Sequence, residues 1–298
     1  MVRRTLFNLI CAYVRNTPPH PGRGVLMRLA GRIYPHEFIA EIEGVKLRLN
    51  SQRGYDLGVL CGTWEVHNEH KVFCAHLKQG MTVMDIGAHI GVYSLLMAKA
   101  VGPTGCVYAF EPVPQFYERL LANIALNGAT NVKPFQVAIS DENGETEFFI
   151  SSPTLFASFD EGGSSMFRYT PAHSQSIKVS TKTLDSFLES QGIERVDAIK
   201  IDVEGAELKV IMGAKNLLSR PDKPLLMLEI NPSALKAAGT TPDELLNAVL
   251  FFGYNAFLIF KGKLIPCETT VTTMKDWWAK IELANYIFKP PDWEHRWQ

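Results

Sequence analysis

The chain has 298 residues, of which 46% are hydrophobic and 20% charged, and its formal net charge is −1. This composition is typical of a globular enzyme with one large domain or two small ones, and it lacks the broad basic field that favours nucleic-acid binding. The five cysteines are odd in number and widely spaced, which favours free thiols over a disulfide framework or a zinc site. We therefore expect a cytoplasmic protein that does not bind nucleic acid.

The N-terminus predicts an amphipathic helix over residues 1–15. Asn8 interrupts its apolar stretch and no small-residue cleavage site follows, so it does not read as a signal peptide. No apolar run approaches the ~20 residues that a transmembrane helix needs. Four apolar residues share one helical face: Leu6, Phe7, Ile10 and Val14. We expect this helix to dock on its own domain, with contact to a membrane surface as the alternative.

Residues 37–49 alternate between apolar and polar around Glu43-Gly44, which predicts a β-hairpin, and a helix is expected over 64–77. From residue 81 onward, strand patterns alternate with helix patterns. The expected strands are 83–86, 106–110, 132–139, 197–203, 225–230 and 254–260. The expected helices are 91–101, 114–127 with Gly128 as its stop, 205–218 and one that starts after Thr241-Pro242.

This alternation predicts an α/β protein with a doubly wound, mostly parallel, seven-stranded sheet in a domain over residues 79–298. A helical and hairpin extension over residues 1–78 precedes it. Residues 145–150 and 176–180 read as an added pair of strands. The segment between them, 151–175, is long for a loop of a compact domain, and we expect it to be a lid over a substrate.

The most informative stretch runs from Val83 to Tyr93 and reads as a buried strand, a glycine turn and the start of a helix. Such turns bind nucleotide cofactors, because glycine allows close approach and the helix N-terminus points free N–H groups at the ligand. The spacing is D-x-G-x-x-x-G, from Asp85 through Gly87 to Gly91, whereas G-x-G-x-x-G holds a pyrophosphate. A carboxylate at the mouth of the loop repels a pyrophosphate and attracts an ammonium or a sulfonium.

The loop therefore predicts S-adenosylmethionine as the cofactor, with Asp85, Gly87, Ala88 and Gly91 as binding residues. An NAD-dependent oxidoreductase is the alternative enzyme, and the missing G-x-G-x-x-G disfavours it. A scaffold that binds the cofactor without catalysis is the alternative of a different class.

Ligands of doubly wound sheets bind at the carboxyl ends of the strands, so the residues there are the candidates for chemistry. Glu111, which ends the second strand, is expected to accept hydrogen bonds from both ribose hydroxyls, and Ser140 is expected at the adenine edge. Asp202 would lie beside the transferring methyl group and bind the cofactor amine or the substrate. Glu204 would be an anchor or a general base, and Glu207 is expected to face solvent.

Six motifs occur in order along residues 55–260: Asp85-Ile86-Gly87-Ala88-x-Ile90-Gly91, Phe110-Glu111-Pro112, Asn123-Ile124-Ala125-Leu126-Asn127, Thr183-Leu184-Asp185, Lys200-Ile201-Asp202-Val203-Glu204-Gly205 and Leu228-Glu229-Ile230. Together they resemble the FkbM-type S-adenosylmethionine-dependent methyltransferases. The resemblance implies the class I methyltransferase fold and, most often, O-methylation of hydroxyls on sugars or natural products. His89 departs from the family, which usually shows Asn there; we expect its ring to brace the loop, with a catalytic role as the alternative.

Methyl transfer from a sulfonium to an alcohol needs the reacting atoms in line at about 3 Å and a base for the hydroxyl proton. The candidate bases are Glu204, Asp202, His89 and, from the long loop, His173. A metal-assisted version would use Asp202, Glu229 and Asn231 as oxygen ligands of Mg²⁺. Because Glu229 and Asn231 can equally bond to the substrate, we expect no metal site.

Overall fold

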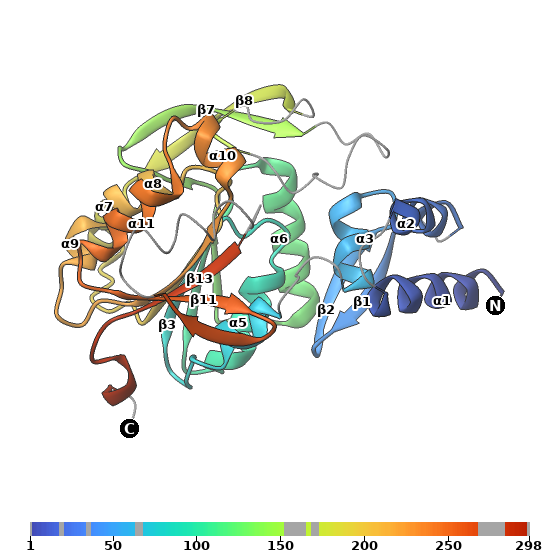
Figure 1. Ribbon diagram of the computed structural model, residues 1–298, viewed down its shortest axis with the longest axis horizontal. Helices are drawn as coiled ribbons and strands as arrows, with labels where there is room; N and C mark the ends of the chain where they lie inside the picture. The colour runs from blue at the N-terminus through green and yellow to red at the C-terminus, as the bar shows by residue number, and fades with distance from the viewer. Residues whose placement is uncertain are drawn as a thin grey trace.

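The structure, a computed structural model, describes residues 2–17, 21–33, 37–62, 68–151, 165–167, 173–267 and 284–296. Figure 1 shows two parts, a small N-terminal unit of helices and a hairpin and a larger α/β unit around a sheet. The N-terminal unit contains α1 (Val2–Asn16), α2 (Pro21–Ile33), β1 (Glu37–Ile42), β2 (Val45–Asn50) and α3 (Gly54–Cys61).

The α/β unit is built on a mixed sheet with the strand order β12-β11-β13-β10-β9-β3-β4-β5. Five neighbouring strands are parallel: β10 (Leu225–Ile230), β9 (Ala198–Ile201), β3 (Thr82–Ile86), β4 (Cys106–Phe110) and β5 (Val132–Phe135). The other three strands are β13 (Ala284–Lys289), β11 (Asn255–Phe260) and β12 (Lys263–Pro266). Strand β13 runs antiparallel to both β10 and β11, and β12 pairs with β11 as a hairpin and forms the edge of the sheet.

The mostly parallel α/β sheet is confirmed, but the expected number of seven strands is wrong, since this sheet has eight. The additional edge strand arises from a tight turn at Lys261 and Gly262, which have φ values of 49° and 72°. Such a turn folds β12 directly back on β11. A strand this short carries almost no periodic signal of its own.

Helices cover both faces of the sheet. They are α4 (Glu69–Cys74), α5 (Val92–Val101), α6 (Pro114–Asn127), α7 (Leu184–Gln191), α8 (Glu207–Met212), α9 (Lys215–Leu218), α10 (Pro232–Ala237) and α11 (Pro242–Leu250), with a final turn η1 (Trp293–His295). Successive strand residues point to opposite faces. Met84 of β3 belongs to a buried cluster that includes residues of α7, α8, α9 and α11, and the preceding Val83 belongs to another that includes residues of α4, α5 and α6. The doubly wound architecture is therefore confirmed.

A smaller sheet lies beside the large one and has the order β6-β8-β7, with β6 (Ala138–Ile139), β7 (Gly144–Ser151) and β8 (His173–Lys182). Its antiparallel pair β7–β8 confirms the added strands expected over 145–150 and 176–180. The single strand expected over 132–139 is wrong, because β5 pairs with β4 while β6 pairs with β8. A continuous apolar run in the sequence does not indicate the point at which the chain leaves one sheet and joins another. Most of the expected lid, 151–175, lies outside the described residues.

The expected helix over 205–218 is also wrong as a single element, because it divides into α8 and α9. Gly213 lies between them, where an added Cβ would be 2.0 Å from the carbonyl oxygen of Ser140. The helix expected over 64–77 is shorter in the structure: α4 starts after Asn68, whose φ is 56°, and ends at Cys74, and residues 63–67 lie outside the described part. By contrast, α6 spans the predicted residues and ends at Gly128 with a φ of 58°.

The N-terminal unit has its own small core. The hairpin β1–β2 is confirmed, with its turn at Glu43 and Gly44. Helix α1 docks on α2 and α3 and buries three of its four expected residues: Phe7, Ile10 and Val14. Leu6 is 44% exposed, so its place on the buried face is wrong and Cys11 lies there instead. No described helix is long and apolar enough to cross a membrane.

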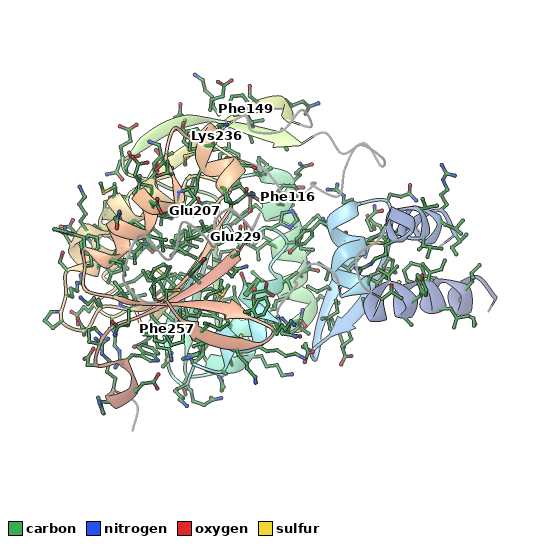
Figure 2. The ribbon with its side chains drawn as sticks, in the orientation of Figure 1. Phe116, Phe149, Glu207, Glu229, Lys236 and Phe257 are labelled. Atoms are coloured by element: carbon green, nitrogen blue, oxygen red, sulfur yellow. The ribbon has the colours of Figure 1, made fainter. Side chains whose placement is uncertain are left out.

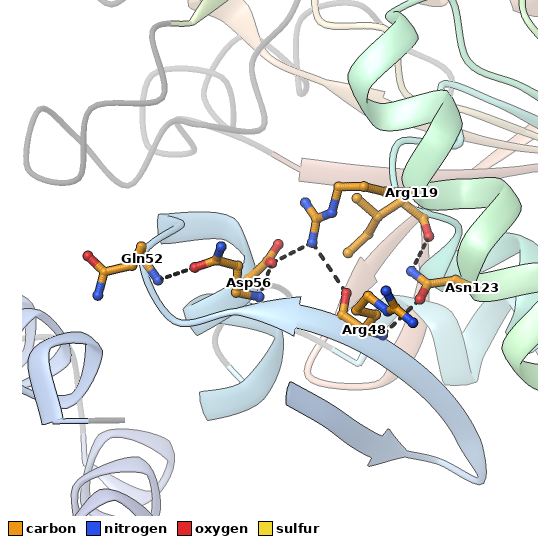
Figure 3. Close-up of polar contacts among 7 residues, drawn as sticks. Arg48, Gln52, Asp56, Arg119 and Asn123 are labelled. Carbon is orange, nitrogen blue, oxygen red and sulfur yellow. Dashed lines mark hydrogen bonds and ion pairs between the residues drawn. The ribbon is translucent and has the colours of Figure 1, made fainter. Parts of the chain in front are cut away.

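Polar contacts join the N-terminal unit to α6 (Figure 3). The side chain of Asn123 accepts a hydrogen bond from the Arg48 backbone N–H at 2.7 Å and donates to the Ile90 carbonyl at 2.9 Å. Arg119 pairs with the buried Asp56 of α3 at 2.5 Å. Asn127 bonds to the backbone N–H and carbonyl of Lys46. Because Ile90 belongs to the glycine loop, the hairpin and that loop share Asn123 as a common support.

Candidate active site

The loop between β3 and α5 contains three residues with positive φ: Gly87 (84°), His89 (51°) and Gly91 (89°). An added Cβ on Gly87 would lie 1.8 Å from the carbonyl oxygen of Asp202, and one on Gly91 would lie 2.5 Å from the side chain of Leu120. Both glycines are therefore required by the packing of the chain against itself. Their predicted role in the approach of a ligand stays a prediction.

Asp85 lies beneath the loop. Its carboxylate is fully buried, accepts a hydrogen bond from Ser94 Oγ at 2.5 Å and lies 3.3 Å from Lys200 Nζ. Its expected position at the mouth of the loop is therefore wrong, because the chain itself supplies the cation that faces Asp85. Lys200 also donates to the Gly87 carbonyl at 3.0 Å, so the two residues support the loop from below.

Glu111 follows β4 and is held by two backbone N–H groups. Its Oε2 accepts from His89 and its Oε1 from Val113, each at 2.8 Å. Burial raises the pKa of Glu111 to about 7, against the lowering effect of these two bonds. Each carboxylate oxygen can accept a second hydrogen bond, so Glu111 presents a fixed pair of acceptors. That arrangement fits two adjacent hydroxyls, and the predicted ribose contact stays a prediction.

His89 contributes a buried imidazole to the same region. Its ring lies between Tyr55 and Phe116, with centroid distances of 4.2 Å and 4.1 Å. Burial, with Arg119 nearby, holds the pKa of His89 well below 6.5, so the ring is neutral at neutral pH. Its positive φ explains the residue type, since Asn and His are both enriched in left-handed conformations. Among the described residues, neither ring nitrogen has a hydrogen-bond partner.

Ser140 follows β6 and is buried. Its backbone N–H donates to the Lys182 carbonyl at 2.9 Å, and its hydroxyl lies 3.0 Å from an oxygen of Asp141. These contacts fix the chain where it leaves the small sheet. The adenine contact expected of Ser140 stays a prediction.

Three carboxylates converge at the ends of β9 and β10. Single oxygens of Asp202, Glu204 and Glu229 lie within 4.8 Å of one another, and all three side chains are half-buried. Burial first, and then the nearby carboxylates, raise the pKa of Glu229 well above 4.5. Lys200 lies below, 3.3 Å from Asp202, and the two carboxylates beside it raise its pKa despite burial. We therefore expect Lys200 to stay charged at neutral pH, and the protonated form of Glu229 to be favoured relative to a free carboxyl group.

Glu207 belongs to the same acidic edge, near Glu229 in Figure 2. The expectation that it faces solvent is wrong, because only 1% of it is exposed. Its carboxylate accepts hydrogen bonds from the backbone N–H groups of Gly205 and Val203, at distances between 3.0 and 3.2 Å. Burial raises its pKa to about 7. Glu207 thus closes the turn that carries Glu204, which itself has a φ of 51°.

Asn231 has a different role from the metal ligand considered above. Its side-chain oxygen accepts from the backbone N–H groups of Ser233 and Ala234 and caps α10. Its amide nitrogen donates to Glu204 Oε2 at 3.3 Å. The amide oxygen is thus used by the helix, and Asn231 orients Glu204.

Three residues of this region were not predicted as parts of the site: Lys200, Asn123 and Tyr55. Lys200 stands in a strand of otherwise apolar residues, which is a detectable signal for a buried, paired charge. Asn123 lies on the buried face of an amphipathic helix, which is a similar signal. Tyr55 gave no signal, because its contact with His89 depends on how the N-terminal unit docks.

The donor set of this edge fits S-adenosylmethionine. Glu111 offers fixed acceptors for hydroxyl groups, the orphaned nitrogens of His89 match a polar group, and Asp202 and Glu204 place negative charge where a sulfonium would be stabilised. The five cysteines, in the described residues, are free thiols.

Comparison with known proteins agrees with this geometry. The family model described as the methyltransferase FkbM domain matches residues 85–256. The 2-O-methyltransferase NoeI of Sinorhizobium fredii is 28% identical over 189 residues, which cover 60% of this chain and 76% of NoeI. The 31-O-demethyl-FK506 methyltransferase FkbM of Streptomyces tacrolimicus is 30% identical over 162 residues, covering 47% of this chain and 62% of that protein.

A crystal structure of methyltransferase FkbM from Methylobacillus flagellatus KT superposes with a TM-score of 0.42 and 14% identity, covering 97% of this chain and 59% of that chain. The chain spans less than two thirds of the length of some relatives that it matches. The family model covers more than half of the sequence and includes the glycine loop, Glu111 and the acidic edge. The chain therefore belongs to the FkbM methyltransferase family.

Proposed function

We propose that the enzyme transfers a methyl group to a hydroxyl of a small-molecule acceptor, a sugar or a natural product. The observation that carries this proposal is the acidic edge, where Asp202, Glu204 and Glu229 share one space beside the cofactor loop. The names of two relatives specify O-methylation, which supports the same reaction. In the bound state S-adenosylmethionine supplies a methyl group on a positively charged sulfur.

The loop side of the edge binds the cofactor in this proposal. Glu111 accepts hydrogen bonds from the ribose hydroxyls, and Ser140 lies at the adenine edge. Gly87, Ala88 and Gly91 keep the loop tight enough for its backbone to line the site. Asp85 acts from below through Lys200 and Ser94.

The acidic side accepts the hydroxyl proton. Burial and the neighbouring carboxylates raise the pKa of Glu229, so of the three carboxylates it is the one that gives up its negative charge most readily. Glu204 is the proposed base, with Asn231 fixing its carboxylate, and Asp202 orients the hydroxyl. As the C–O bond forms and the C–S bond breaks, the proton passes to Glu204 and S-adenosylhomocysteine leaves. His89 braces the loop, because its neutral ring is enclosed by Tyr55 and Phe116.

The long loop supports the site as a lid in the same proposal. Its described part includes Ser165, which is buried and bridges to Phe149 of β7. The hydroxyl of Ser165 donates to the carbonyl oxygen of Glu204 at 2.5 Å. The loop therefore reaches the backbone of the proposed base and can exclude water from it.

The test is transfer of a radiolabelled methyl group to a panel of free sugars, uronic acids and polyketide alcohols, and to the small-molecule fraction of a cell extract. Glu204→Gln should lower turnover by about 10²–10⁴-fold while S-adenosylhomocysteine still binds. Exposed Glu142→Gln is the matched carboxylate-to-amide control and should leave turnover unchanged. Labelling that persists in EDTA supports the carboxylate mechanism. Full activity of Glu204→Gln would contradict the assignment of the base, and cofactor binding without any labelled product would favour a scaffold.

A further inference from the structure

The N-terminal unit carries most of the exposed large apolar side chains of the described chain. Six of the ten lie between residues 6 and 39: Leu6, Leu9, Tyr13, Val25, Leu29 and Ile39. Single exposed apolar residues are ordinary on a protein surface, but a concentration in one small unit marks a contact surface. We call the five that lie on α1 and α2, which are all but Ile39, the outer apolar set.

The outer apolar set follows helical spacing. Leu6, Leu9 and Tyr13 are separated by three and four residues and share one side of α1. The inner side of the same helix, with Phe7, Ile10 and Val14, is already buried against α2 and α3. Val25 and Leu29 are four residues apart on α2. Each helix therefore has a second apolar stripe beyond the one that its own core uses.

Charge is distributed very unevenly between this unit and the rest of the chain. Residues 1–36 contain six arginines and no Asp, Glu or Lys, so they carry a formal charge of +6. The remaining residues must then carry −7 to give the total of −1. An anionic surface attracts the first segment and repels the rest, which would orient the molecule with its N-terminal unit forward.

We propose that the α1–α2 pair docks on the surface of an anionic lipid bilayer, with the outer apolar set at the level of the headgroups. Arginines beside aliphatic and tyrosine side chains on short amphipathic helices are the combination that such a surface selects. Helix α1 has 15 residues and α2 has 13, and both are shorter than the ~20 residues that a bilayer-spanning helix requires. The helices would therefore lie on the membrane and not cross it.

The geometry leaves catalysis intact in the docked state. In Figure 1 the α1–α2 pair lies at the far side of the N-terminal unit from the α/β sheet. Contacts with the α/β unit come instead from β2 and α3, where Tyr55 packs on His89 of the loop and Arg48 and Asp56 bond to Asn123 and Arg119 of α6. Docking through α1 and α2 therefore leaves the cofactor loop and the acidic edge free of the membrane.

The test is co-sedimentation of the full chain with vesicles of phosphatidylcholine alone, and of equal parts phosphatidylcholine and phosphatidylglycerol. We expect binding to the anionic vesicles that is roughly tenfold or more tighter than to the neutral ones and that weakens with added salt. The triple variant Leu9→Ser, Val25→Ser, Leu29→Ser should lose this binding by about tenfold or more. Phe251→Ser is the matched control, because Phe251 is 85% exposed but lies on the α/β unit.

Folding of each variant is checked by circular dichroism and by S-adenosylhomocysteine binding, neither of which needs an acceptor. Absence of binding by the folded wild type to anionic vesicles overturns the proposal. Equal loss in the triple variant and in Phe251→Ser also overturns it, because binding would then not depend on the N-terminal unit. A dimer that the triple variant dissociates, without vesicle binding, would assign the outer apolar set to a second copy of the chain.

Discussion

The two sides of the active-site edge handle negative charge in opposite ways. On the loop side, Asp85 forms an ion pair with Lys200 and accepts a hydrogen bond from Ser94, and Glu111 accepts hydrogen bonds from two backbone N–H groups. On the acidic side, Asp202, Glu204 and Glu229 crowd together, with Lys200 beneath them. The first arrangement fixes the position of each carboxylate through donors of the chain, and the second places carboxylates against one another, where burial and the neighbouring charges raise the pKa of Glu229. Carboxylates can therefore form either a binding surface or a proton acceptor, depending on whether their neighbours are hydrogen-bond donors and cations or other carboxylates.

The largest loss of folding stability is expected from a substitution in the glycine loop. Gly87→Ala should destabilise the fold by about 3–5 kcal/mol, because the new Cβ would overlap the Asp202 carbonyl at a positive φ. Gly128→Ala is the matched control, since Gly128 has a φ of 58° and open space around it, and it should cost about 1 kcal/mol. Urea denaturation measures both. An equal loss of stability in the two variants would show that backbone strain alone, and not the contact with the Asp202 carbonyl, requires glycine at position 87.

The second prediction concerns the acidic side and the pH dependence of its contribution to folding stability. The pKa of Glu207 is about 7 when folded and 4.5 in the reference state. Its contribution to stability is therefore complete below pH 4.5 and is lost as the pH rises through 7, a change of about 3 kcal/mol. Glu207→Gln cannot ionise, so its stability relative to wild type should improve by about this amount between pH 4 and pH 8.

Urea denaturation at the two pH values provides the comparison, with Glu244→Gln as a control of opposite sign. Hydrogen bonds from Thr240 and Thr241 lower the pKa of Glu244, so its contribution is present at high pH and lost as the pH falls. The Glu244→Gln variant should therefore be relatively worse at pH 8. If the stability of Glu207→Gln relative to the wild type did not change between the two pH values, the raised pKa of Glu207 would be contradicted.

A smaller effect separates the loop from the hairpin that supports it. Asn123→Ala removes the bonds to both Arg48 and Ile90, so S-adenosylhomocysteine should bind about 5–10-fold more weakly. Asn127→Ala, one turn along the same helix, removes the hairpin bonds to Lys46 and a bond to the Asn123 carbonyl but no bond to the loop, and should leave the affinity within about twofold. Isothermal calorimetry measures both. Equal weakening by the two variants would show that docking of the hairpin matters and the bond to the loop does not.

The smallest effect concerns His89. His89→Asn keeps a residue type that suits a φ of 51° but loses the ring contacts with Tyr55 and Phe116, so stability should fall by about 1 kcal/mol. Turnover at saturating cofactor should change less than about threefold if the ring only braces the loop. A loss of turnover of about 10²-fold or more with an unchanged fold would assign catalysis to His89 instead.

Local signals in the sequence predicted several elements well, and tertiary contacts account for the errors. Helix α6 has Pro114 at its start and Gly128 at its end, and the hairpin turns at Glu43-Gly44, so adjacent residues define both. Glu111 and the acidic residues follow strand patterns, which is why the carboxyl edge could be located before the fold was seen.

The errors share a different physical cause. Whether Asp85 faces a ligand or Lys200 depends on a residue 115 positions later, and whether Glu207 is exposed depends on how its turn closes. The division of residues 132–139 between two sheets depends on strand partners far along the chain. Spacing and composition describe neighbours in sequence, and these outcomes are decided by neighbours in space.

The most direct test of the account is a calorimetric titration of S-adenosylhomocysteine into the wild type and two variants. Glu111→Ala should bind roughly tenfold or more weakly, because the fixed acceptor pair of the loop side is lost. Glu204→Gln should bind S-adenosylhomocysteine with the affinity of the wild type, because this ligand lacks the sulfonium charge that the acidic side would stabilise. Unchanged affinity in Glu111→Ala, or a comparable loss in Glu204→Gln, would contradict the division of the edge into a binding side and a proton-accepting side.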